Sequence, residues 1–304
     1  MRTALDPGER LPSPDPVTHG ASGWQARLEL RFAPGHGATR LVHNRHEGPL
    51  RLIRALPLPD GRCQAVLVHP PGGLVGGDRL DLDIRLENGA QVLCTTPGAQ
   101  KWYRAVRGGA RALTRIQAGA SSGLEWLPQP TLIYDAAQVD QTLSIDLAPD
   151  ARMIGWECLV LGRAAMGERF LHGFLRQRLS LSVGHQPLWA ERTAVAAGDR
   201  LFDSPLGWGG RTVACTVWAV AGSDPIADAC RETWRSQIAQ FSDSPAGRSV
   251  RFEGGVSRVL SGLMTARLLA DDSQAVMTVA QDLWASARPA VLGAASEAPR
   301  IWAT

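Results

Sequence analysis

The sequence has few lysines, few cysteines and no long hydrophobic run, and each shortage excludes a class of protein. Lys101 is the one lysine among 32 basic residues, so arginine carries nearly all of the positive charge. The arginines are interspersed with acidic residues, and the formal net charge is only +3 over 304 residues. The chain therefore lacks the clustered basic surface that binds nucleic acid.

The five cysteines lie far apart and include no Cys-x-x-Cys pair. This spacing predicts buried thiols rather than a zinc site or a disulfide framework. No run of about 18 apolar residues could span a bilayer, and the N-terminus lacks the apolar segment of a signal peptide. We therefore expect a protein of the reducing cytoplasm, without a membrane partner.

The chain divides into a short tail and a long folded region. Prolines and small polar residues dominate residues 1–22, which predicts a flexible N-terminal tail. From Trp24 onward, apolar residues occupy alternate positions, as they do in a half-buried strand. Such runs recur to about residue 220, and no linker separates them. We expect residues 23–304 to form a single domain.

The breaks between these runs favour a mainly β protein. Turn residues recur about every 8 to 15 positions, which indicates a sandwich, barrel or coiled sheet rather than a βαβ arrangement. Two helices are predicted near the C-terminus, one after Asp224-Pro225 and one from Asp271 to the helix-stopping Pro289. Their Trp234 and Trp284 have two explanations, as aromatic anchors for a partner or as core residues.

A glycine-rich segment separates two predicted strands at His69–Leu80. Its four glycines and two prolines predict a shaped loop rather than a regular element. A phosphate-binding loop would end in Gly-Lys-Ser/Thr and continue into a helix, whereas here Gly77 precedes Asp78 and then a strand. The loop is therefore predicted to position Asp78 and not to bind a nucleotide. The Asn88-Gly89 pair beyond it predicts a hairpin.

Two further patterns resemble catalytic motifs but lack the required context. Gly119–Gly123 matches the Gly-x-Ser-x-Gly nucleophile elbow, which needs a following helix, but Leu124–Pro128 reads as a short strand. His43 and His46 fall on a predicted strand, where their side chains point to opposite faces. We therefore predict a turn for the first pattern and no metal pair for the second.

Single carboxylates are the better candidates for contact with a metal ion. They are Asp78, Asp81, Asp83, Glu157, Glu168 and Glu191. Carboxylate and water ligands hold divalent ions more weakly than Cys/His sets, which suits passage rather than storage. Each residue taken alone is more often a solvated or arginine-paired charge. Because no nucleophile, acid/base pair or cofactor motif is complete, the sequence favours a binding or scaffold protein over an enzyme.

Several short motifs follow one another along the chain. They are Gly23-Trp24-x-Ala26, His69 to Asp78, Thr96-Pro97-Gly98-Ala99, Leu124 to Gln129, Leu161-Gly162-Arg163, Glu191-Arg192 and Pro299 to Thr304. In this order they resemble the urease accessory protein UreD family, also called UreH, over residues 23–304. The resemblance implies a large, irregular β-helix-like or coiled-sheet body with two helices near the C-terminus.

The resemblance also implies a function. It is that of a non-enzymatic, cytoplasmic metallochaperone that binds apo-urease with UreF and the GTPase UreG and assists GTP-dependent nickel insertion. Family proteins are thought to contain a water-filled channel, whose acidic residues match Asp78 and Glu191. These two are our candidates for a nickel path, with nickel in transit and no tightly bound cofactor. Arg79 and Arg192 must then point elsewhere or pair with acids.

One alternative function remains open from the residues themselves. A stand-alone β-rich hydrolase could use two of the carboxylates as its catalytic pair. Such a pair would have to lie about 5 to 9.5 Å apart across an open cleft.

Overall fold

The alternation of apolar and polar residues places successive side chains in two environments. In β1 (Gln25–Pro34), Ala26, Leu28, Leu30 and Phe32 are buried, and the residues between them face outward. The computed structural model describes residues 23–221, 226–242, 250–295 and 297–303. The tail predicted over residues 1–22 lies outside these ranges.

The first of two sheets has seven strands in the order β15-β14-β12-β9-β6-β1-β2. Its inner five strands run parallel, and the edge strands β2 and β15 are antiparallel to their neighbours. Besides β1, the strands are β2 (Thr39–Glu47), β6 (Arg79–Leu86), β9 (Ala110–Ala118), β12 (Gln138–Leu147), β14 (Phe174–Val183) and β15 (Gln186–Ala196).

The second sheet has eleven strands, with the main order β17-β18-β16-β13-β10-β7-β4-β3 and the short β5, β8 and β11 as a branch. Its strands are β3 (Arg51–Pro57), β4 (Cys63–Val68), β5 (Gly73–Leu74), β7 (Gln91–Thr95), β8 (Gln100–Trp102), β10 (Gly123–Leu127), β11 (Thr131–Ile133), β13 (Arg152–Leu161), β16 (Val213–Val220), β17 (Glu253–Leu260) and β18 (Leu263–Ala270). The glycine-rich loop thus contains one two-residue strand, β5.

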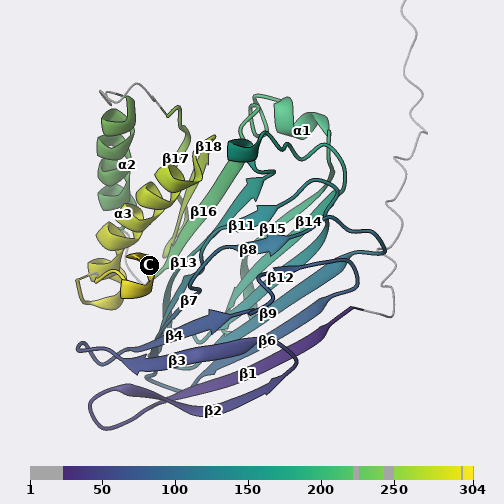
Figure 1. Cartoon of the computed structure of the whole chain (residues 1–304). Coiled ribbons are helices and arrows are strands. Elements are labelled where there is room, and N and C mark those ends of the chain that lie inside the picture. The colour runs from purple at the N-terminus through teal and green to yellow at the C-terminus, as the bar shows by residue number, and fades with distance from the viewer. Residues whose placement is uncertain (1–22, 222–225, 243–249, 296, 304) are drawn as a thin grey trace, which may run out of the picture.

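The chain passes from one sheet to the other and back, as β6, β7, β9, β10, β12 and β13 show (Figure 1). Each coil adds one parallel strand to each sheet, which confirms the predicted coiled-sheet, β-helix-like body. The predicted hairpin at Asn88-Gly89 is wrong, because β6 and β7 belong to different sheets. The Asn88 side chain instead accepts a hydrogen bond from the amide of Ala120 (2.9 Å), so this corner stacks on the corner of the next coil.

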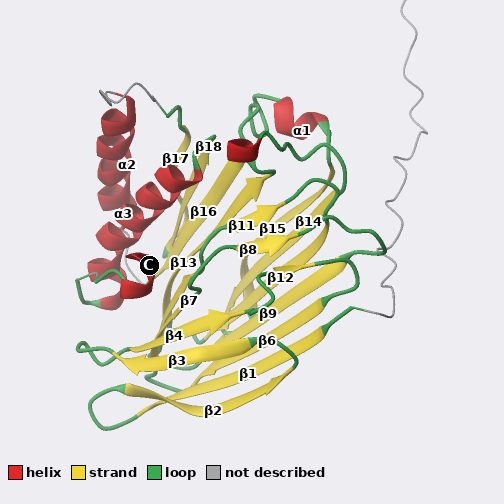
Figure 2. Ribbon diagram, viewed as in Figure 1, coloured by secondary structure: helices red, strands yellow, loops and turns green. Residues whose placement is uncertain are grey.

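Two hydrophobic cores follow from this arrangement. One lies between the two sheets and contains Leu28, Val92 and Leu143. The other lies on the outer face of the second sheet, under α2 (Ile226–Ser242) and α3 (Ser273–Leu292), and contains Leu93 and Val279. The helices lie side by side along one flank of the strands (Figure 2). Neighbouring residues such as Val92 and Leu93 therefore serve different cores.

The two C-terminal helices confirm the prediction, with one change at the end of α3. Asp272 caps α3 by accepting hydrogen bonds from the amides of Gln274 and Ala275, both at 2.9 Å. Pro289 does not stop the helix, which continues to Leu292. The proline removes one backbone hydrogen bond, but the buried Ala287 and Val291 keep the last turn packed on the sheet. The predicted start of α2 at residues 224–225 lies outside the described ranges.

Three short helical turns complete the fold. They are α1 (Arg200–Asp203), η1 (Ala164–Met166) and η2 (Arg300–Ala303). The helix α1, a single turn capped by Asp199, was not predicted from the sequence. Of the two tryptophans considered as anchors, Trp284 is 2% exposed and is a core residue. Trp234 is half-buried and packs against Phe252.

Candidate functional site

The glycine-rich loop is held in shape by the carboxylate of Asp78. One oxygen accepts a hydrogen bond from the amide of Trp24 (2.8 Å), and the other accepts one from the amide of Val75 (2.9 Å). Asp78 is buried, and the loop continues into β6 rather than into a helix. The carboxylate therefore occupies amide donors that a phosphate would need, in agreement with the predicted turn.

Glycine is required in this loop because backbones pass close together. A Cβ atom on Gly76 would lie 2.4 Å from the carbonyl oxygen of Arg107. Gly77 has a φ of +93°, a backbone conformation that residues with a side chain rarely adopt. Its amide donates a hydrogen bond to the carbonyl of Gly109 (3.1 Å). The loop is thereby fixed against the next coil.

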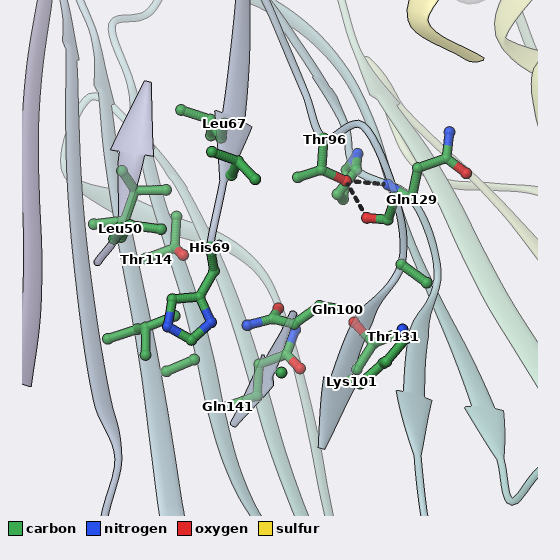
Figure 3. Close-up of a pocket in the computed structure, with 18 of the residues that line it drawn as sticks. Leu50, Leu67, His69, Thr96, Gln100, Lys101, Thr114, Gln129, Thr131 and Gln141 are labelled. Carbon is green, nitrogen blue, oxygen red and sulfur yellow. Dashed lines mark hydrogen bonds between the residues drawn. The ribbon is translucent and has the colours of Figure 1, made fainter. Parts of the chain in front are cut away.

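A cavity of about 380 Å³ lies beside this loop, between the two sheets. Leucines from both sheets form much of its wall. Its polar lining includes His69, Gln100, Lys101, Thr114, Gln141 and Glu157. In Figure 3, the side chains of His69, Gln100 and Gln141 converge on a common space. A large cavity with a few converging polar groups is the usual form of a binding site.

A second, smaller cavity of about 100 Å³ lies further toward the β15 edge of the first sheet. Glu157 lines it as well, so this one carboxyl group stands at the boundary of both cavities. Glu191 and Arg267 also line the smaller cavity. Of the two predicted nickel-path residues, Glu191 thus faces a cavity, whereas Asp78 is absent from the described walls of both.

Strand register places polar residues in two rows that face each other across these cavities. In the first sheet, Gln141 pairs with Gln177 and Gln177 with Thr193. In the second sheet, Glu157 pairs with Thr216 and Thr216 with Arg267. At these paired positions, polar side chains replace the leucines and valines that line the rest of the interior.

Glu157 is hydrogen-bonded to the opposite row. Its two carboxyl oxygens accept from the side-chain amides of Gln141 (3.1 Å) and Gln177 (2.7 Å). Burial raises the pKa of Glu157 to about 7, and the two amide donors only partly oppose this rise. The group can therefore gain or lose a proton near neutral pH.

Glu191 forms an ion pair with Arg267 at the outer end of the rows. Their side chains are 26% and 60% exposed, so the pair lies where the interior meets solvent. The arginine that pairs with Glu191 is therefore Arg267, which was not among the arginines considered from the sequence. Arg192 is exposed and follows Glu191 on a strand, so it points to the opposite face.

The other sequence candidates are separated from these cavities. Asp83 faces Arg115 on the outer surface of the first sheet, and Glu168 is bound by Arg163. His43 is half-exposed and 3.8 Å from Glu29. Within the described ranges, no group of three or more His, Cys, Asp or Glu side chains could hold a metal ion. The cysteines are all free and buried, as predicted.

Sequence reasoning missed Gln141, Gln177 and the interior role of His69. A signal existed for the glutamines, because each replaces an apolar residue at an interior position of its strand. Gln177, for example, lies between the buried Leu175 and Leu179. Only the structure shows that these positions meet Glu157.

The larger cavity does not fit the hydrolase alternative. Glu157 is the one carboxylate among the described residues of its wall. The smaller cavity holds Glu157 and Glu191, but its volume of about 100 Å³ is below the range of ordinary ligand pockets. No observation thus favours a catalytic pair of carboxylates across an open cleft.

Fold and site together define a coiled-sheet β protein in which two facing rows of polar residues interrupt the hydrophobic interior between the sheets. The family model for the UreD urease accessory protein matches residues 25–303. Proteins named urease accessory protein UreD are 39% identical in Delftia acidovorans, over 93% of this chain and 96% of the relative, and 40% identical in Pseudomonas aeruginosa, over 96% and 98%. A third, from Dechloromonas aromatica, is 39% identical over 97% and 99%. The chain belongs to the UreD urease accessory protein family.

No helix within the described residues is both long enough and apolar enough to cross a bilayer.

Proposed function

We propose that this protein takes part in urease maturation as a non-enzymatic metallochaperone in the cytoplasm. In this proposal it binds apo-urease together with UreF and UreG and assists GTP-dependent nickel insertion, with the GTP chemistry supplied by UreG. Membership of the UreD family supports the role in urease maturation. Nickel is cargo in transit, and no cofactor is tightly bound.

The proposal assigns part of the nickel route to the polar rows between the two sheets. The observation that carries it is the position of Glu157, which lines both cavities and is hydrogen-bonded across the interior. Oxygen ligands and water hold divalent ions weakly, so an ion can leave as readily as it enters. A carboxyl that ionises near neutral pH can also release its proton when a cation arrives.

Asp78 and Glu191 have different roles in this route. Glu191 offers a carboxylate in the smaller cavity, provided that a cation displaces Arg267 from it. Asp78 contributes indirectly, because its oxygens are engaged by backbone amides. It fixes the loop that forms part of the larger cavity wall, and its negative charge acts on the neighbouring His69.

The test is the nickel content of urease matured with variants of this protein. Glu157→Gln and Glu191→Ala are expected to lower nickel per urease active site while the complex with apo-urease, UreF and UreG still forms. Asp83→Ala is the matched control, since Asp83 is an acidic residue on the outer face of the first sheet. Normal nickel loading by an assembled complex that carries both site variants would refute the route.

A further inference from the structure

Three side chains in the wall of the larger cavity have polar atoms without hydrogen-bond partners among the described residues. Both ring nitrogens of His69 are buried and unpartnered, and so are the side-chain oxygen of Gln141 and the indole N–H of Trp126. Buried polar atoms in folded proteins are almost always satisfied, so each unsatisfied one calls for an explanation. Here three such side chains lie in the wall of one cavity, and His69 and Gln141 are the two that can offer a lone pair.

Hydrogen bonds fix the backbone of His69 and the side-chain amide of Gln141. His69 follows β4 directly, and its carbonyl accepts a hydrogen bond from the amide of Gly72 (2.8 Å), which holds the turn. The amide nitrogen of Gln141 is used by Glu157. The oxygen of Gln141 is therefore left for the cavity, on which the side chain of His69 also converges (Figure 3).

Two of the unsatisfied side chains offer lone pairs to the cavity. A neutral imidazole offers a nitrogen lone pair, and an amide oxygen accepts hydrogen bonds or binds cations. Imidazole suits nickel, zinc, copper and iron ions. Burial lowers the pKa of His69, although Asp78 opposes the shift, so the ring is available in its neutral, metal-binding form.

We infer that His69 and Gln141 form a low-affinity station for a borderline divalent cation in the larger cavity. The imidazole nitrogen and the amide oxygen are its two protein ligands, and water completes the coordination shell. The inference rests on the proposed nickel route, which identifies the cation as Ni²⁺. Glu157, bound to Gln141, is the next oxygen ligand toward the smaller cavity.

Two protein ligands make a weak site, as transit requires. Within the described ranges, His69 belongs to no group of three or more His, Cys, Asp or Glu side chains that could hold a metal ion. Lys101 also lines the cavity, and its positive charge further limits the affinity for a cation. Fast release is the expected property of such a station.

The experiment measures binding of Ni²⁺ alone to the full chain in its complex with UreF, by equilibrium dialysis and X-ray absorption. His69→Phe keeps the ring volume and removes the nitrogens, and Gln141→Leu removes the amide. His172→Phe, at an exposed histidine paired with Asp135, is the control. We expect His69→Phe to weaken Ni²⁺ binding at least tenfold and to remove the imidazole signal, Gln141→Leu to weaken binding less, and the control to change neither.

The outcomes separate this inference from the proposed function. Unchanged Ni²⁺ affinity and an unchanged imidazole signal in His69→Phe would show that His69 does not bind the cation. The unsatisfied atoms would then be explained by buried water. The route itself would survive that result if Glu157→Gln still lowered nickel loading of urease. If His69→Phe does not assemble, His69→Asn is measured in its place, and the same two readouts decide.

Discussion

At the scale of single residues, Asp78 and Glu157 are both enclosed carboxyl groups in opposite situations. Asp78 is surrounded by backbone amides that hold the chain in position. Glu157 faces two cavities and accepts hydrogen bonds from two side-chain amides. The first arrangement stabilises the fold, whereas the second makes the charged form of the acid costly.

Removal of the Asp78 carboxylate is expected to destabilise the protein. Asp78→Ala leaves the amides of Trp24 and Val75 without their acceptors in a buried loop, which costs about 1–3 kcal/mol for each unsatisfied group. We expect a loss of about 2–4 kcal/mol in the free energy of unfolding, measured by urea denaturation. Asp81→Ala, on the next strand, should change it by less than about 0.5 kcal/mol. Equal stability of the two variants would contradict the structural role of Asp78.

Glu157 is expected to make the stability depend on pH. Its pKa is about 7 in the folded protein against an ordinary value of 4.5. Between pH 4.5 and pH 7, Glu157 keeps its proton in the folded state but has released it in the unfolded chain. The free energy of unfolding therefore falls as pH rises through this range. Below pH 4.5 the effect is absent, and above pH 7 it is complete, at about 3 kcal/mol.

Urea denaturation of the wild type and of Glu157→Gln at pH 5 and pH 8 measures this contribution. The fall in unfolding free energy from pH 5 to pH 8 should be smaller in the variant by about 2–3 kcal/mol, because glutamine does not titrate. Identical falls in the two proteins would mean that Glu157 has an ordinary pKa.

At the scale of elements, a buried ionic cluster attaches α3 to the second sheet. Glu125 of β10 accepts hydrogen bonds from Trp284 (2.7 Å) and Arg288 (2.9 Å) of α3, and it also binds Arg62. Arg288 reaches Asp60 as well (3.2 Å). Removing one member of such a cluster leaves buried charges unpaired, which is strongly unfavourable.

Glu125→Ala is therefore expected to lower the free energy of unfolding by about 3–5 kcal/mol. Asp228→Ala is the control, because its ion pair with Arg231 is solvent-exposed and contributes about 0–1 kcal/mol. A loss of less than 1 kcal/mol in Glu125→Ala would show that α3 is held by its apolar face alone.

The strands were largely predictable, because alternation records which face of each strand is buried. The turn at Asn88-Gly89 was not, since an Asn-Gly pair suits both a hairpin and a corner between sheets. The Asn88 side chain is hydrogen-bonded to Ala120 in the next coil, and the residues around Asn88 do not predict that contact. The predicted end of α3 at Pro289 was wrong for a similar reason. Packing against the sheet maintains a last helical turn that proline disfavours locally.

At the scale of the whole molecule, strand register assembles the site. Glu157 is 16 residues from Gln141 and 20 from Gln177, and its hydrogen bonds to them cross from one sheet to the other. The sequence indicated the carboxylates as candidates, and the family resemblance selected Asp78 and Glu191. Neither could show that Glu157 stands between two cavities, because that position depends on the stacking of three coils.

The central claim is that nickel passes through the interior between the sheets, and a variant that blocks this space tests it most directly. Thr114→Trp places a large ring in the larger cavity without removing a ligand. Gln117→Trp places the same ring on the outer face of the same strand, β9. The measurement is nickel per active site of urease matured with each assembled complex. We predict at least a tenfold loss with Thr114→Trp and normal loading with Gln117→Trp, whereas normal loading with both would contradict the interior route.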